Sequence, residues 1–231
     1  MKIIGLIGGL TWHSTVDYYR LINEMTNKQL GGVHASKSVI YSVDFAEIKF
    51  YTEKEDRDTL GKIMLEAAQS LERAGADCVL IGANTMHYVA HKVEPFINIP
   101  LIHVAECVAT AITVQQLKKV ALLGTKYAMR SEVYPEKLER HGIEMIIPDN
   151  EEDIDIINDA IYKEFSMGIF SAETKQKYLT IIDKLIQRGA EGIILGCTEI
   201  PILIKQNDCT VPVFDTTFLH AQAAVEFALA D

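Results

Sequence analysis

The cysteine at position 197 is the residue of this chain best placed to do chemistry. It lies in the turn Gly196-Cys197-Thr198-Glu199, between a short apolar run predicted to be a buried strand and a predicted helix. At a helix start, unpaired backbone N–H groups and the helix dipole favour a thiolate and lower the pKa of a cysteine. The same N–H groups, together with the Thr198 hydroxyl, are suited to hold a carboxylate. We therefore interpret Cys197 as a reactive thiol.

A second turn, Gly82-Ala83-Asn84-Thr85, takes the equivalent place in the first half of the chain. Residues 71–85 align without a gap on residues 185–199, and this internal repeat pairs Ala83 with Cys197. Asn84 and Thr85 are suited either to bind a carboxylate at the start of a helix or only to cap that helix. The methyl group of Ala83 cannot transfer a proton. We call residues 82–85 the Ala83 turn and residues 196–199 the Cys197 turn.

The glycine-rich run that ends at Gly9 follows the first predicted strand. It lacks the GxGxxG and GxxxxGK spacings, so it does not indicate a nucleotide phosphate site. We interpret Gly9 and Leu10 as part of a tight turn that lines the substrate pocket. Residues 4–9 resemble residues 120–125, which makes Thr125 the counterpart of Gly9 in the second half of the chain.

The remaining histidines and cysteines give weaker signals. His87 and His91 stand four residues apart, a spacing that two metal ligands can use on an α-helix, but no HExxH motif or third ligand accompanies them. We predict no metal site. The other cysteines form no CxxC pair and are expected to be free thiols: Cys78, Cys107 and Cys209.

Short apolar runs alternate along the chain with longer segments of helical periodicity, such as residues 14–30 and 174–188, which is typical of a parallel sheet covered by helices. Eight strand and helix units are compatible with one closed barrel or with two open sheets. Because the repeat falls at half the chain length, we predict two pseudo-symmetric doubly wound α/β lobes with the active site between them. The expected lobes are residues 1–103 plus 209–231, and residues 104–208. The predicted strands are residues 2–7, 38–43, 78–81, 100–102, 119–123, 143–147, 192–195 and 211–214.

Composition limits the classes of partner. The 231 residues include 22 basic and 32 acidic side chains, for a net charge of −10, and 48% of the residues are hydrophobic. An acidic chain without a basic run is a poor match for nucleic acid or an anionic membrane surface. No segment reads as a membrane span or a secretion signal, so we expect a cytoplasmic protein. We also expect it to form a homodimer.

Taken together, these motifs resemble the aspartate/glutamate racemase family. The resemblance runs essentially end to end and rests on the following segments: Gly8-Gly9-Leu10-Thr11-Trp12, Ala83-Asn84-Thr85-Met86-His87, Leu122-Leu123-Gly124-Thr125, Gly196-Cys197-Thr198-Glu199 and Phe214-Asp215-Thr216. It implies a cofactor-independent enzyme in which two opposed thiols transfer protons at the two faces of Cα. Cys197 matches the second thiol, whereas Ala83 stands where the family usually has the first. Many members also carry a lysine near the glycine that matches Gly168, where this chain has Ser166.

The resemblance and the residues lead to one expected function. We expect a PLP-independent racemase of a small acidic amino acid, aspartate or glutamate, impaired by the loss of the first cysteine. The catalytic positions would be Cys197 and Ala83, and the residues expected to bind substrate are Gly9, Leu10, Ala83, Asn84, Thr85, Thr125, Thr198 and Glu199. Two alternatives are a single-cysteine decarboxylase or isomerase of a dicarboxylate, and a non-catalytic protein that binds acidic amino acids.

Overall fold

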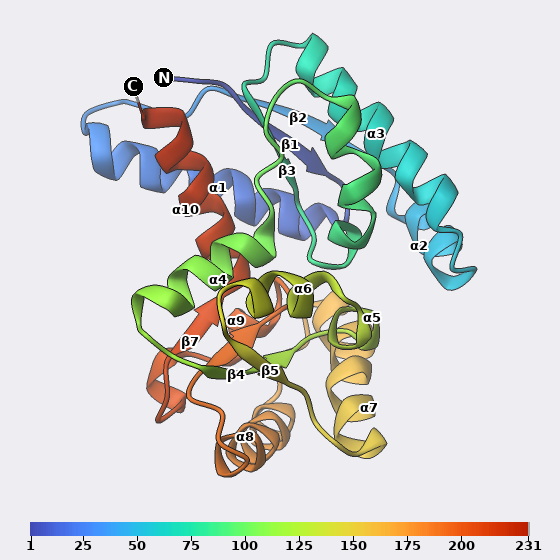
Figure 1. Cartoon of the computed structure of the whole chain (residues 1–231), viewed down its shortest axis with the longest axis vertical. Helices are drawn as coiled ribbons and strands as arrows, with labels where there is room; N and C mark the ends of the chain where they lie inside the picture. The colour runs from blue at the N-terminus through green and yellow to red at the C-terminus, as the bar shows by residue number, and fades with distance from the viewer. Residues whose placement is uncertain (231) are drawn as a thin grey trace. The chain divides into compact units, whose positions relative to one another are not determined.

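A computed structural model describes residues 1–230 of the chain (Figure 1). Its strands are β1 (Ile4–Gly8), β2 (Ser38–Ser42), β3 (Cys78–Ile81), β4 (Lys119–Leu123), β5 (Glu144–Ile146), β6 (Ile193–Leu195) and β7 (Val213–Asp215). Its α-helices are α1 (Trp12–Leu30), α2 (Phe45–Glu53), α3 (Arg57–Arg73), α4 (Val104–Val114), α5 (Lys126–Arg130), α6 (Val133–Arg140), α7 (Glu151–Asp159), α8 (Ala172–Gln187), α9 (Ile200–Leu203) and α10 (Thr216–Leu229). The 3₁₀-helices are η1 (Thr85–Lys92), η2 (Glu94–Phe96), η4 (Phe165–Met167) and η5 (Gln206–Asp208), and η3 (Ala160–Glu164) is a π-helix.

The chain forms two compact units. Unit 1 is Met1–Val104 with Thr217–Asp231, and unit 2 is Ala105–Thr216. The sequence predicted that the chain re-enters the first lobe at residue 209. Because β7 pairs with β6, residues 209–216 belong with unit 2, and the chain re-enters unit 1 at Thr217. Each unit holds one parallel sheet, ordered β2-β1-β3 in unit 1 and β5-β4-β6-β7 in unit 2. The α/β fold with two lobes is therefore confirmed, and the barrel alternative is wrong.

Unit 1 buries both faces of its sheet. Because side chains alternate along a strand, Ile4 and Leu6 of β1 pack with α1 and α10, whereas Ile7 packs with α3 and η1 on the opposite face. Helix α1 turns Tyr18 and Ile22, four residues apart, toward the sheet. Figure 1 shows α1 and α3 at the two sides of the three strands. The arrangement leaves the carboxyl ends of β1 and β3 side by side at one edge.

Unit 2 follows the same plan. Its central strands β4 and β6 are buried except for the partly exposed Lys119, and Figure 1 shows α6 and α8 on opposite sides of the sheet. That placement follows from two right-handed crossovers that run in opposite directions along the sheet, from β4 to β5 through α6 and from β5 back to β6 through α8. Helix α8 is capped by Ser171, whose side chain accepts a hydrogen bond from the Thr174 N–H. None of the helices within residues 1–230 has both the length and the apolar composition needed to cross a bilayer.

Strand pairing shows that the internal repeat is structural. Val79 lies opposite Gly5 in unit 1, and the residues that the repeat makes equivalent to them, Ile193 and Ala121, lie opposite each other in unit 2. The predicted strand at residues 100–102 is a single bridge between Val79 and Leu101. This bridge matches the pairing of Ile193 with Val213 in β7. The two halves are therefore pseudo-symmetric in strand order and in register.

Candidate active site

The Cys197 turn is fixed by its glycine. The N–H of Gly196 donates to the Leu123 carbonyl oxygen at 2.7 Å, which ties the turn to the end of β4. A Cβ at this position would lie 2.6 Å from a Leu122 methyl carbon and 3.0 Å from the Leu123 oxygen, so a larger residue would push the turn away. Cys197 follows as a partly buried residue at the carboxyl edge of the sheet. This is the edge at which ligands of parallel sheets bind.

The thiol of Cys197 is paired with a carboxylate. Its Sγ–H donates to Oε2 of Glu199 at 2.9 Å. Burial and the negative charge of Glu199 raise the pKa of Cys197 well above its usual value, and the N–H groups of Glu199 and Thr198 oppose that rise only in part. The resting thiol is therefore protonated.

The expectation of a lowered pKa at Cys197 is wrong for this structure. It assumed a helix start directly after the cysteine, but α9 begins three residues later, at Ile200, and is only four residues long. So short a helix has a small dipole, and its effect is confined to its first turn. The adjacent carboxylate and the burial of the thiol outweigh it.

The Ala83 turn has the same anchor as its counterpart. The Gly82 N–H donates to the Ile7 carbonyl oxygen at 2.9 Å, which is the bond equivalent to that of Gly196. Ala83 is partly buried, and its methyl group brings no acid or base to the turn. Asn84 is buried with helical dihedral angles, and Thr85 begins η1. Asn84 makes no side-chain capping hydrogen bond to η1, so the interpretation of this residue as a simple cap is wrong.

The other predicted binding residues lie at the same edge of their own sheets. Gly9 has a φ of +78°, and a Cβ there would lie 2.1 Å from the Val43 carbonyl oxygen, so only glycine fits. The side chain of Leu10 is 6% exposed and packs in the core of unit 1, which leaves only its backbone for a ligand. Thr125 caps α5 through a hydrogen bond from the Ala128 N–H. Each unit thus collects its predicted residues at the carboxyl ends of its strands.

The two histidines of the candidate metal pair do not face each other. His87 is 2% exposed, whereas His91 is exposed. They belong to a 3₁₀-helix, in which residues four apart point in different directions. Across residues 1–230, no three His, Cys, Asp or Glu side chains gather in a way suited to a metal ion.

The remaining cysteines and Ser166 stand apart from this chemistry. Cys78, Cys107 and Cys209 are free thiols, as the sequence predicted. Burial raises the pKa of Cys78, in the core of unit 1, to about 12. Ser166 is exposed, and its hydroxyl donates to the Tyr162 carbonyl oxygen at 2.8 Å, within its own helical segment.

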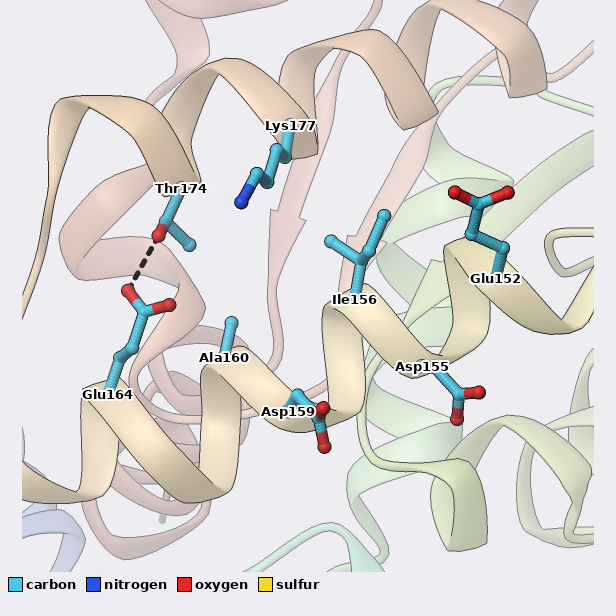
Figure 2. A pocket seen from close by; sticks show the side chains of 8 residues that line it. All are labelled: Glu152, Asp155, Ile156, Asp159, Ala160, Glu164, Thr174 and Lys177. Carbon is cyan, nitrogen blue, oxygen red and sulfur yellow. Dashed lines mark hydrogen bonds between the residues drawn. The ribbon is translucent and has the colours of Figure 1, made fainter.

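A pocket of about 510 Å³ opens elsewhere on unit 2, between α7, η3 and α8 (Figure 2). None of the predicted site residues lines it. Four carboxylates and a single ammonium group surround it, a balance that repels an acidic substrate. Its carboxylate Glu164 accepts a hydrogen bond from the Thr174 hydroxyl at 2.6 Å. The lining residues are Glu152, Asp155, Ile156, Asp159, Ala160, Glu164, Thr174 and Lys177.

Sequence reasoning missed two roles within these turns. It assigned Glu199 to substrate binding and did not foresee that the side chain accepts the hydrogen bond of the Cys197 thiol. It considered His87 as a metal ligand or as a plain surface or helix-capping residue, whereas His87 is buried and contacts the Ala83 carbonyl oxygen at 2.9 Å. Sequence proximity was the signal that could have indicated both contacts, because Glu199 follows Cys197 by two residues and His87 follows Ala83 by four.

The fold and the two turns define a class of enzyme, the racemases built from two related α/β lobes. The profile of the family described as Asp/Glu/hydantoin racemase matches residues 7–224, and the chain belongs to this family. The family predicted from the sequence motifs is thereby confirmed.

Known proteins similar to this chain agree with that assignment. A Yersinia pestis protein assigned as an Asp/Glu racemase is 46% identical over the full length of both chains, with a TM-score of 0.94. An aspartate racemase homologue from Pyrococcus horikoshii OT3 is 36% identical over the full length of both chains, with a TM-score of 0.88. The broad specificity amino-acid racemase RacX of Bacillus subtilis (strain 168) is 24% identical, and the match covers 99% of each chain.

Proposed function

We propose that this chain racemises an acidic amino acid, aspartate or glutamate, by proton transfer at Cα without a cofactor. One observation carries the proposal: the Cys197 thiol sits at the carboxyl end of β6 and donates to the Glu199 carboxylate at 2.9 Å. Family membership and the names of the similar proteins support the reaction class.

Cys197 and Glu199 together supply one complete acid–base group. To remove a proton, the Cys197 S–H proton moves to Oε2 of Glu199, and the resulting thiolate takes the proton from Cα. The electron pair of the Cα–H bond stays on the substrate as a carbanion. In the reverse direction the thiol protonates the carbanion, and Glu199 returns its proton to sulfur. A well-placed group of this kind contributes typically about 10²–10⁴-fold to a rate.

Ala83 limits the second half of the reaction. Inversion at Cα needs a proton donor or acceptor on each face of the carbanion, and the family usually provides a thiol at the position of Ala83. In this chain, water or a hydroxyl such as that of Thr85 has to replace that thiol. We therefore propose that hydrogen exchange at Cα on the Cys197 face outpaces full inversion.

We expect the backbone and hydroxyl groups of the Ala83 turn to bind the α-carboxylate. Asn84 and Thr85 supply these donors, with Gly9 at the adjacent strand end of unit 1. Ser166 replaces the lysine with which many family members bind the distal carboxylate. The proposal therefore keeps both aspartate and glutamate as substrates.

Exchange in deuterated water tests the proposal. Each enantiomer of aspartate and glutamate is incubated with the protein, and NMR follows Cα–H loss while chiral chromatography follows inversion. We expect exchange to be faster than inversion, and we expect Cys197→Ser to abolish both, because a serine hydroxyl is a far weaker acid than a thiol. A Cys197→Ser protein with the parent's rate would overturn the assignment.

A single-cysteine decarboxylase is the second candidate. The observation that favours it is a protonated thiol whose counterpart in the repeat is an alanine, because one proton donor suffices when only one face is protonated. In that reaction the bond between Cα and a carboxylate of a substituted malonate breaks, carbon dioxide leaves, and Cys197 protonates the carbanion. Carbon dioxide release from such a malonate, without exchange of amino acids, would select this alternative. Calorimetric binding of aspartate without any turnover would select a binding protein.

A further inference from the structure

The ring of His87 is held in one tautomer. Its Nε2 lies 3.2 Å from the Val104 backbone nitrogen, and its Nδ1 lies 2.9 Å from the Ala83 carbonyl oxygen. A backbone N–H only donates, so Nε2 accepts, and Nδ1 must carry the proton that it donates to Ala83. Burial lowers the pKa of His87 to about 4, so the ring is neutral at physiological pH. With both nitrogens occupied, His87 is neither a free base nor a metal ligand.

The hydrogen bond to Ala83 is a side-chain substitute for a helical one. In an α-helix the backbone N–H of residue 87 would donate to the carbonyl of residue 83. Here η1 is a 3₁₀-helix, and the His87 N–H donates to Asn84 instead, at 3.2 Å. The side chain of the same histidine donates a hydrogen bond to the Ala83 carbonyl oxygen in place of the backbone N–H.

That bond fixes the direction of the next backbone N–H group. The Ala83 carbonyl and the Asn84 N–H belong to one planar trans peptide, so they point in opposite directions. Holding the carbonyl against His87 therefore aims the Asn84 N–H away from the body of η1. Because Val104 dictates the tautomer, this orientation is built into the fold of unit 1.

We propose that His87 is a positioning residue, which holds the Ala83–Asn84 peptide so that the Asn84 N–H meets the α-carboxylate of the substrate. The inference rests on the proposed function, because it needs the Ala83 turn to bind an amino-acid carboxylate. It assigns to His87 a task that is distinct from proton transfer. The effect is expected on substrate binding more than on the chemical step.

Two substitutions test the roles of the two ring nitrogens of His87 separately. The amide nitrogen of His87→Asn lies near the place of Nδ1 and can still donate to Ala83, but it leaves Val104 without its acceptor. His87→Gln places its amide near Nε2, so it can serve Val104 but not Ala83. Each variant loses one buried hydrogen bond, so their melting temperatures should fall by similar amounts. His220→Gln is the matched control: it keeps the contact with the Ile102 oxygen and loses that with the Tyr18 hydroxyl.

The KM values for aspartate and glutamate give the first readout. We expect KM to rise about tenfold in His87→Gln, the worth of one hydrogen bond to a charged group, with kcat changed less. His87→Asn and His220→Gln should stay within about threefold of the parent. Equal increases in the Asn and Gln variants, or an equal increase in His220→Gln, would mean that His87 only stabilises the fold and would overturn the inference.

The backbone amide signal of Asn84 in nitrogen–proton NMR gives a second readout that needs no turnover. It should shift in His87→Gln and stay in place in His87→Asn, and a signal that responds equally to both would overturn the positioning role. If the parent protein neither exchanges nor binds an acidic amino acid, the proposed function fails, and the carboxylate part of the inference fails with it. The amide signal then still decides whether His87 orients the peptide.

Discussion

Replacing Glu199 by Gln should make Cys197 far more reactive at neutral pH. Ionising the thiol of the parent protein puts a second negative charge 2.9 Å from that of the carboxylate oxygen. Coulomb's law gives about 1.4 kcal/mol for that repulsion even at the dielectric constant of water, and more in a partly buried turn. Removing the carboxylate lowers the pKa of Cys197. Since about 1.4 kcal/mol is a factor of ten, the thiolate fraction at pH 7 should rise at least about tenfold.

Alkylation by iodoacetamide, followed peptide by peptide in a mass spectrometer, measures this change because the thiolate is the reacting species. Cys209 is the internal control: burial and Asp208 raise its pKa, and Glu199 is not among its charged neighbours. The rate at Cys197 should increase at least about tenfold in the variant while the rate at Cys209 stays constant. If Cys197 reacts no faster in Glu199→Gln than in the parent, Glu199 does not hold the thiol protonated, and the proposed proton path is refuted.

Three further predictions concern unit 1. Ala83→Cys restores a second acid–base group, so racemisation measured by polarimetry should rise about 10²–10⁴-fold; a variant that binds substrate but gains no rate would contradict the two-base scheme. Gly9→Ala forces a Cβ toward the Val43 oxygen at positive φ and should cost at least about 1–3 kcal/mol in urea unfolding, whereas an unchanged midpoint would contradict the steric argument. Burial lowers the pKa of His220 to about 3 and that of His87 to about 4, so the stability that they contribute is complete above about pH 6.5 and falls toward pH 4 by about 1.4 kcal/mol per pH unit for each. His220→Gln should remove one such contribution, so the free energy of unfolding should fall less steeply between about pH 6.5 and pH 4 than in the parent. An unchanged dependence of the free energy of unfolding on pH would argue against a neutral buried His220.

The sequence by itself determined the family, the strands and the place of both turns. Local signals suffice for these features: runs of Val, Ile and Leu predict buried strands, and Gly31 after α1 and Gly189 after α8 mark helix ends through positive φ. The internal repeat added long-range information. It paired Ala83 with Cys197, and the strand registers agree with that pairing.

Only the tertiary structure decided the state of the groups within those turns. The protonation of Cys197 depends on its burial and on the direction in which the Glu199 side chain points, and no sequence pattern encodes either. The tautomer of His87 is set by the N–H of Val104, seventeen residues away along the chain. The boundary of unit 2 likewise depends on the pairing of β7 with β6. Sequence patterns report local conformation and burial, whereas a proton's position depends on the distances between groups that the fold brings together.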